Sequence, residues 1–238
     1  MLLTLAELSL AQGSLLACEE RALEAERVAR DIPRVVHCIH ALGVAGQSRA
    51  ALGRSSEALS MAREAATLAR ARGRVDTVPE LLAAAAAARA LCAGGEPGEA
   101  LMLLPSPTGR GTVGLQDPIR VVWAIRARAL SLSRPEEARE AIQETMARAP
   151  SRLPWTGARE QLDLAAALVQ CGASSAQREV ARSVETAHDS GLWMYELESL
   201  ELQRRLSSTE AIVDRMDGLR TKLASTLSES EYFVRRWT

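Results

Sequence analysis

Aromatic residues are scarce in this sequence, making up 3% of its 238 residues. β-Strands favour aromatic and β-branched side chains, whereas Ala and Leu suit helices that pack closely. Hydrophobic residues nevertheless account for 47% of the chain, and Ala and Leu dominate its apolar stretches. The composition therefore predicts an all-α fold with a core large enough for a globular protein.

The sequence also lacks an excess of charge of either sign. Its 29 basic and 30 acidic residues give a net charge of −1. A chain without a basic surplus has no general attraction to nucleic acid or to an anionic lipid surface. Lys222 is the single lysine, so arginine supplies nearly all positive charge. We interpret this bias as the codon composition of a GC-rich bacterial genome and expect no nucleic-acid partner.

No apolar run reaches the roughly 18–20 residues that a membrane span needs. The longest run, Leu81 to Ala88, is too short and is followed by Arg89. The first residues contain Glu7 and have no basic region, which argues against a signal peptide. We expect a cytoplasmic protein that does not associate with a membrane.

Cysteine is sparse, with four residues far apart in the sequence: Cys18, Cys38, Cys92 and Cys171. Each lies in an apolar context typical of a helix. Such a pattern fits reduced, buried thiols better than a disulfide framework. It agrees with a reducing compartment.

The stretch from Cys38 to Arg74 predicts two helices joined by a tight turn. Its apolar residues recur at the i, i+3, i+4 and i+7 spacing of amphipathic helices. Gly53 and Gly73 follow the two periodic runs and mark their ends. Ser55 and Ser56 open the second run, where serine is a favourable N-cap.

Small residues in this hairpin lie where two antiparallel helices must come closest. Gly46 is midway along the first helix, and Ala58 and Ala65 are on the second. Side chains this small allow the short end of the roughly 8–10 Å range of distances between helix axes. One hairpin cannot bury its own apolar face, so it needs copies of itself on either side.

The chain supplies such copies at a spacing near 40 residues. The small residues that correspond to Gly46 in successive units are Ala6, Gly46, Ala88, Ala127 and Ala165. A fixed period of this size is typical of stacked helical hairpins, in which each unit contacts its neighbours and the ends need capping. We predict about five antiparallel hairpins followed by a C-terminal capping helix pair.

The predicted organisation has three parts. Residues 1–190 carry the repeats, interrupted by a Pro- and Gly-rich loop at 105–118, and residues 191–228 form the capping helix pair. A tail at 229–238 contains the aromatic residues Tyr232, Phe233 and Trp237. The tail either folds back on the last helix or offers a contact to a partner, since Tyr, Trp and Arg are favoured in binding hot spots.

The 38–74 hairpin resembles a tetratricopeptide repeat (TPR). The residues that match the small and turn positions of that motif are Gly46, Gly53, Ala58 and Ala65. Trp123, one turn before Ala127, matches a further position, whereas Arg49 replaces an aromatic residue of the motif. The period also exceeds the family's 34 residues.

The long second helices are similar to divergent repeats in bacterial STAND-type ATPases, LuxR-type regulators and kinase-linked sensors. The resemblance implies a right-handed α-solenoid that acts as a binding scaffold. It implies no particular ligand. We expect either a short complete subunit or a piece of a longer regulatory protein, with its oligomeric state left open.

In arrays of this kind the first helices line the concave face. The residues beside the small packing positions then become candidates for partner binding: His40, Gln47, Arg89, Arg128, Arg159 and Leu162. The three arginines recur on successive units and could hold a partner's carboxylates in bidentate pairs. Alternatively, they are solvated or paired with Glu80, Glu136 and Glu160.

Motifs for catalysis are weak. His37 and His40 have zinc-ligand spacing beside Cys38, but no second ligand cluster accompanies them. The segment 109–114 lacks the lysine and preceding strand of a phosphate-binding loop. Consecutive residues at 188–190 include His, Asp and Ser, which cannot converge from one helix end. We expect no enzyme activity, no metal and no cofactor.

The favoured hypothesis is a non-catalytic protein- or peptide-binding scaffold, a regulatory module of a bacterial signalling or multi-protein system. One alternative is a sensor of a small ligand or signalling peptide whose array changes curvature on binding. An all-helical enzyme is the third hypothesis. A sensor should gain thermal stability from a small ligand by mass action, whereas a scaffold should respond to a macromolecule.

Overall fold

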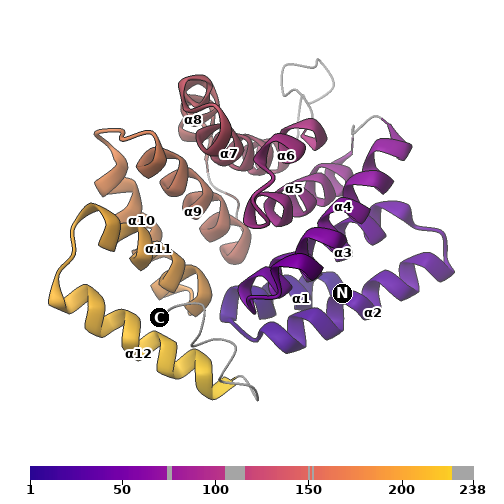
Figure 1. Cartoon of the computed structure of the whole chain (residues 1–238), viewed down its shortest axis with the longest axis horizontal. Helices are drawn as coiled ribbons and strands as arrows, with labels where there is room; N and C mark the ends of the chain where they lie inside the picture. The colour runs from indigo at the N-terminus through magenta and orange to yellow at the C-terminus, as the bar shows by residue number, and fades with distance from the viewer. Residues whose placement is uncertain (74–76, 105–115, 150, 152, 227–238) are drawn as a thin grey trace.

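The computed structural model describes residues 1–73, 77–104, 116–149, 151 and 153–226 (Figure 1). These parts of the chain are helical and contain no β-strand, which confirms the predicted all-α class. No helix within them is both long and apolar enough to cross a membrane.

The helices in the described parts follow one another with short connections. Their bounds are α1 (Leu2–Gln12), α2 (Leu15–Asp31), α3 (Val35–Ala51), α4 (Ser55–Arg72), α5 (Val78–Ala93), α6 (Pro97–Leu103), α7 (Gln116–Ser133), the 3₁₀ helix η2 (Pro135–Glu137), α8 (Ala138–Met146), α9 (Pro154–Gln170), α10 (Ala176–Asp189), α11 (Trp193–Leu206) and α12 (Glu210–Thr226).

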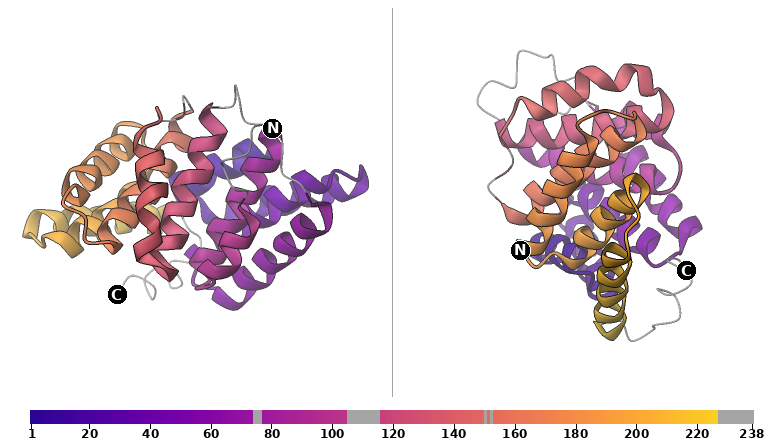
Figure 2. Two further views of the ribbon diagram at one scale, coloured as in Figure 1. Left: turned by 90° about the horizontal axis from the view of Figure 1, so that it is seen from above. Right: turned by 90° about the vertical axis from the view of Figure 1, so that its left-hand side faces the viewer.

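Successive helices pack in pairs, from α1 with α2 to α11 with α12. The first helix of each pair also packs against the first helix of the next pair, in the order α1, α3, α5, α7, α9 and α11. The circuit closes because α11 contacts α1 in turn. Figure 1 shows the pairs arranged around a centre, with the first and last pairs at its lower edge, and Figure 2 gives two further views of the same fold. The first helices therefore share an inner surface.

The predicted hairpin at 38–74 corresponds to α3 and α4. A Cβ on Gly46 would lie 3.3 Å from the carbonyl oxygen of Ala58, so the two helices do approach closely there. Ala58 and Ala65 are fully buried. A closer approach, which the sequence did not reveal, joins α3 to α5: a Cβ on Gly43 would lie 2.6 Å from the backbone of Ala86 and Ala87.

The ends of the helices agree only in part with the sequence-based predictions. Gly53 has φ of 79°, the left-handed conformation suited to the turn after α3. The predicted N-cap serines of α4 are wrong, because Ser55 is already helical and Arg54 is the N-cap. Ser175 is the N-cap of α10 but makes no side-chain cap hydrogen bond. Thr77, by contrast, forms a full capping box at the start of α5.

The predicted loop at 105–118 extends too far. Its residues 105–115 lie outside the described residues, and residues 116–118 are the first turn of α7. The predicted capping pair at 191–228 corresponds to α11 and α12. The tail residues Tyr232, Phe233 and Trp237 lie outside the described part of the chain.

Two apolar clusters form the core. One joins α3, α4 and α5 to α7 and α9. The other brings the two ends of the chain together, with Leu10 and Leu15 packed in the same cluster as Met194, Leu197 and Met216. The circuit therefore closes through an apolar contact that buries side chains from the first and last pairs of helices.

The four cysteines are free thiols. Cys18, Cys38 and Cys92 are buried as predicted, but Cys171 is partly exposed, so the prediction is wrong there. Burial raises the pKa of Cys18 to about 12 and that of Cys92 to about 11. These two thiols are therefore protonated at neutral pH and suited to packing.

Candidate functional site

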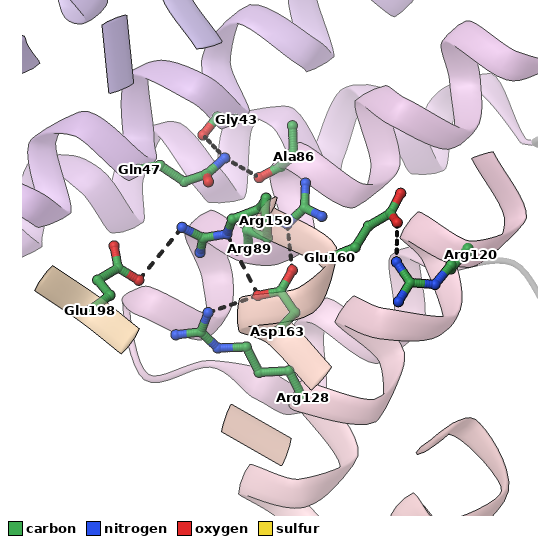
Figure 3. Close-up of polar contacts among 10 residues, drawn as sticks. All are labelled: Gly43, Gln47, Ala86, Arg89, Arg120, Arg128, Arg159, Glu160, Asp163 and Glu198. Carbon is green, nitrogen blue, oxygen red and sulfur yellow. Dashed lines mark hydrogen bonds and ion pairs between the residues drawn. The ribbon is translucent and has the colours of Figure 1, made fainter. Parts of the chain in front are cut away.

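The three arginines of the predicted binding surface converge on one carboxylate (Figure 3). Arg89 on α5 donates from Nε to Oδ2 of Asp163 over 2.8 Å. Arg128 on α7 donates from Nη1 to Oδ1 of the same residue over 2.8 Å. Arg159, one turn before Asp163 on α9, lies 3.6 Å from Oδ1. The sequence suggested the arginines but not this shared acid.

Asp163 is completely buried, with 0% of its side chain exposed. Burial alone raises the pKa of a carboxyl group, but the positive charges of Arg89, Arg159 and Arg128 outweigh this effect and hold the pKa of Asp163 well below its usual range. The carboxylate is therefore ionised at any physiological pH and anchors all three guanidinium groups.

Glu198 on α11 supplies the second acid of this group, 3.6 Å from Nη1 of Arg159. We call Arg89, Arg128, Arg159, Asp163 and Glu198 the central ion cluster. It contains three positive and two negative charges. Two of its polar atoms, Nη2 of Arg89 and Nε of Arg159, are buried with no hydrogen-bond partner in the described part of the chain.

Two of the three acids that the sequence suggested as partners for these arginines pair with other arginines instead. Glu80 is bound by Arg72, and Glu160 is bound by Arg120. The Arg120–Glu160 pair is itself buried between α7 and α9. Burial raises the pKa of Glu160 despite the charge of Arg120. This second pair helps to join neighbouring helices, and the charge of Arg89 also acts on Glu160.

Gln47 on α3 forms a bridge beside the cluster. Its Nε2 donates to the carbonyl oxygens of Gly43 and Ala86, each over 3.2 Å. The bond to Ala86 crosses from α3 to α5 at their closest approach. These two bonds fix the side-chain amide of Gln47 in place on the inner surface.

Two cavities lie next to each other on the inner surface. Leu10, Gln47 and Arg159 line both of them, so these three side chains separate the cavities. We call the first cavity A; its volume is about 310 Å³, and its lining includes Glu7, His40, Leu82, Arg89, Trp155 and Tyr195. We call the second cavity B; its volume is about 340 Å³, and its lining includes Arg128, Leu132, Leu162, Glu198, Glu201 and Arg205.

Cavity A contains one acidic side chain of its own. Oε1 of Glu7 lies 2.9 Å from Nε2 of His40, joining α1 to α3. Burial raises the pKa of Glu7, but the hydrogen bond with His40 and the charges of His40 and Arg89 outweigh it, so the pKa is lowered. At the wall, the guanidinium of Arg159 stacks 5.2 Å from the ring centre of Tyr195. Burial raises the pKa of Tyr195 to about 12.

The structure thus brings the six candidate residues to one inner surface. His40 and Arg89 line cavity A, Arg128 and Leu162 line cavity B, and Gln47 and Arg159 reach both. Leu162 is buried in the core at the same time. Asp163 was missed, although an acid inside the apolar run from Leu162 to Ala167 is a signal that a buried partner is needed.

The described residues hold no group of three or more His, Cys, Asp or Glu side chains placed to share a metal ion. Nδ1 of His188 lies 3.2 Å from Glu196, which also binds Arg215. The inner surface therefore offers charge, hydrogen-bond donors and apolar walls, which are the means of binding.

Comparison with known proteins gave no match to a family model, to a curated protein or to a solved structure.

Proposed function

We propose that this chain is a non-catalytic binding module, a TPR-like right-handed α-solenoid that takes a protein or peptide partner on its inner surface. The proposal places it in a bacterial regulatory or multi-protein system. The observation that carries it is the convergence of buried arginines and open cavities on the face shared by the first helices.

The outer surface supports this assignment by contrast. Several of its arginines pair with acids of a neighbouring helix pair, as where Arg63 on α4 binds Glu96 and Glu99 at α6. Exposed pairs of this kind contribute little to stability. The mouths of the inner cavities instead carry exposed leucines, Leu153 at cavity A and Leu132 at cavity B, with 52% and 46% of their surface exposed.

Selection of binders from a displayed peptide library, followed by affinity measurement, tests the proposal. Leu153→Arg and Leu132→Arg place a long cation at each mouth without disturbing the core. A peptide held on the inner surface should bind at least about tenfold more weakly to one of these variants, a loss of about 1.4 kcal/mol.

Met102→Arg is the matched control. Met102 on α6 is 67% exposed and lines neither cavity, so the substitution changes the same chemistry on another face. Affinity that falls equally in the control, or that stays unchanged in both mouth variants, would place the binding surface elsewhere.

A second candidate function is a sensor of a small ligand or short signalling peptide. The cavity volumes favour it, because about 310 and 340 Å³ lie at the lower end of the range for small-molecule sites. The contact of α1 with α11 is the part of the fold that could move in such a sensor. A ligand bound between these two helices would alter how far the circuit of helices closes. A rise in melting temperature with a small molecule, together with a changed radius of gyration in solution scattering, would support it.

A further inference from the structure

Arg89 belongs to the central ion cluster, lines cavity A and has a donor without a hydrogen-bond partner among the described residues. Its side chain is only 10% exposed, and Nε is occupied by Asp163. Nη2 is buried and has no hydrogen-bond partner among the described residues. An unpaired donor on a buried cation is costly, and an anion that reached it would gain a charge-assisted hydrogen bond.

Acidic side chains around cavity A limit the negative charge that a ligand there can carry. The central ion cluster holds three arginines against Asp163 and Glu198. Glu7, whose carboxylate lies against His40, also acts on Arg89, and so does Glu160. A ligand with one negative charge meets less repulsion from Glu7 than a phosphate or a dicarboxylate would.

Cavity B lacks this combination. The guanidinium of Arg128 is bound to Asp163, and Arg205 lies near Glu201, which also accepts from Arg204. Positive and negative side chains thus already face each other at that mouth. Arg89, whose Nη2 is unpaired, lines cavity A and not cavity B.

The remaining walls of cavity A are apolar. Leu82 and Val121 contribute from α5 and α7, Trp155 lies at the start of α9, and Leu153 is exposed at the lining. Walls of this kind favour a ligand whose body is hydrocarbon, at roughly 25 cal/mol for each Å² removed from water. A cavity with a cation on one side and apolar walls on the other fits a ligand that has an acidic group and an apolar body.

We propose that cavity A binds a small monocarboxylic acid with an apolar body, its carboxylate on Nη2 of Arg89 and its body against Leu82, Val121 and Trp155. The inference deepens the small-ligand candidate and rests on it. It is independent of whether a protein partner binds at cavity B.

The test uses calorimetry on the full chain with 3-phenylpropionate and its neutral amide, extended to straight-chain monocarboxylates of four to ten carbons. The acid should bind and the amide should bind at least about tenfold more weakly. Arg89→Gln should weaken acid binding by a similar factor, and it leaves Asp163 paired with Arg128 and Arg159.

Glu7→Gln is expected to increase affinity for the acid, a result that misfolding of the variant cannot produce. Glutamine keeps an oxygen for His40 but removes the competing negative charge, so acid affinity should rise about three- to tenfold. Thr4→Glu adds a charge at an exposed position of the lining and should lower affinity, whereas Thr4→Gln should leave it unchanged.

Equal binding of acid and amide, no binding by any acid in the series, or unchanged affinity in both Glu7→Gln and Arg89→Gln would overturn the inference. A short apolar peptide with a free C-terminus forms the last arm. If it binds more tightly than every free acid, the carboxylate comes from a polypeptide and the small-molecule assignment is wrong. Peptide selection with Leu132→Arg remains a separate test of the scaffold, so failure of one proposal does not decide the other.

Discussion

Arg89 and Asp163 are joined by a 2.8 Å hydrogen bond although 74 residues separate them in the sequence. The bond links α5 to α9 directly, while Arg128 on the intervening α7 reaches the same carboxylate (Figure 3). One acid therefore fixes the relative positions of first helices from three successive pairs. The inner surface is held in shape by this contact as well as by apolar packing.

Replacement of Asp163 by asparagine should destabilise the protein by about 3–5 kcal/mol, because it leaves buried guanidinium groups without their common anion. Chemical denaturation of the wild type and variant measures the difference. Asp217→Asn is the control, since Asp217 pairs with Arg220 at the surface and is 61% exposed. The control should change stability by less than about 0.5 kcal/mol. Similar stability of the two variants would show that the cluster does not hold the fold together.

Lowering the pH should reveal how much Asp163 contributes to stability. The native pKa of Asp163 lies below its ordinary value of 3.8, so below about pH 5 the unfolded chain takes up a proton that the native protein refuses. The stabilisation is fully present above that ordinary value and is lost as the pH falls through it toward the native pKa. Denaturation at pH 6, 5, 4 and 3 should therefore give a steeper fall in stability for the wild type than for Asp163→Asn. Parallel curves would contradict the ion pairing.

Gly43 should tolerate a methyl group poorly. A Cβ there would lie 2.6 Å from the backbone of Ala86 and Ala87, so α3 and α5 would have to move apart. We expect Gly43→Ala to cost about 1–3 kcal/mol. Gly218→Ala is the matched control in α12, where nothing lies within 4 Å, and should stabilise by about 0.5–1 kcal/mol. Thermal melting of both variants compares them, and a stabilising Gly43→Ala would contradict the close approach.

Local features of the fold could be predicted from the sequence. The contact between Gly46 and Ala58 depends on residues within one hairpin, where helical periodicity and small side chains determine which faces meet. The inward position of Arg89, Arg128 and Arg159 followed from their spacing relative to those small residues. Such patterns act over a few helical turns, which is the range that periodicity can report.

Long-range features could not be predicted in the same way. The contact of α1 with α11 depends on small rotations that accumulate from one pair of helices to the next. Asp163 became the shared partner for the same reason, since its distance from Arg89 is set by three pairs of helices together. The prediction of a serine N-cap for α4 was wrong, because the turn after Gly53 places Arg54 at the N-cap instead of Ser55.

The cysteines should differ in their reaction with a thiol reagent. Cys171 is partly exposed, whereas Cys18, Cys38 and Cys92 are buried. In the native protein we expect one thiol to react quickly and the other three only as the protein opens, with all four reacting in denaturant. Cys171→Ser should remove the fast phase. A fast phase that persists in this variant would show that another cysteine is accessible.

Hydrogen–deuterium exchange with and without a selected peptide or acid ligand tests the central claim most directly. If the inner surface binds ligands, added protection should concentrate at the cavity-lining segments of α1, α3, α5 and α9 for cavity A, or of α7, α9 and α11 for cavity B. The second helices α4, α6 and α8 should change little. Protection confined to those outer helices would contradict the account.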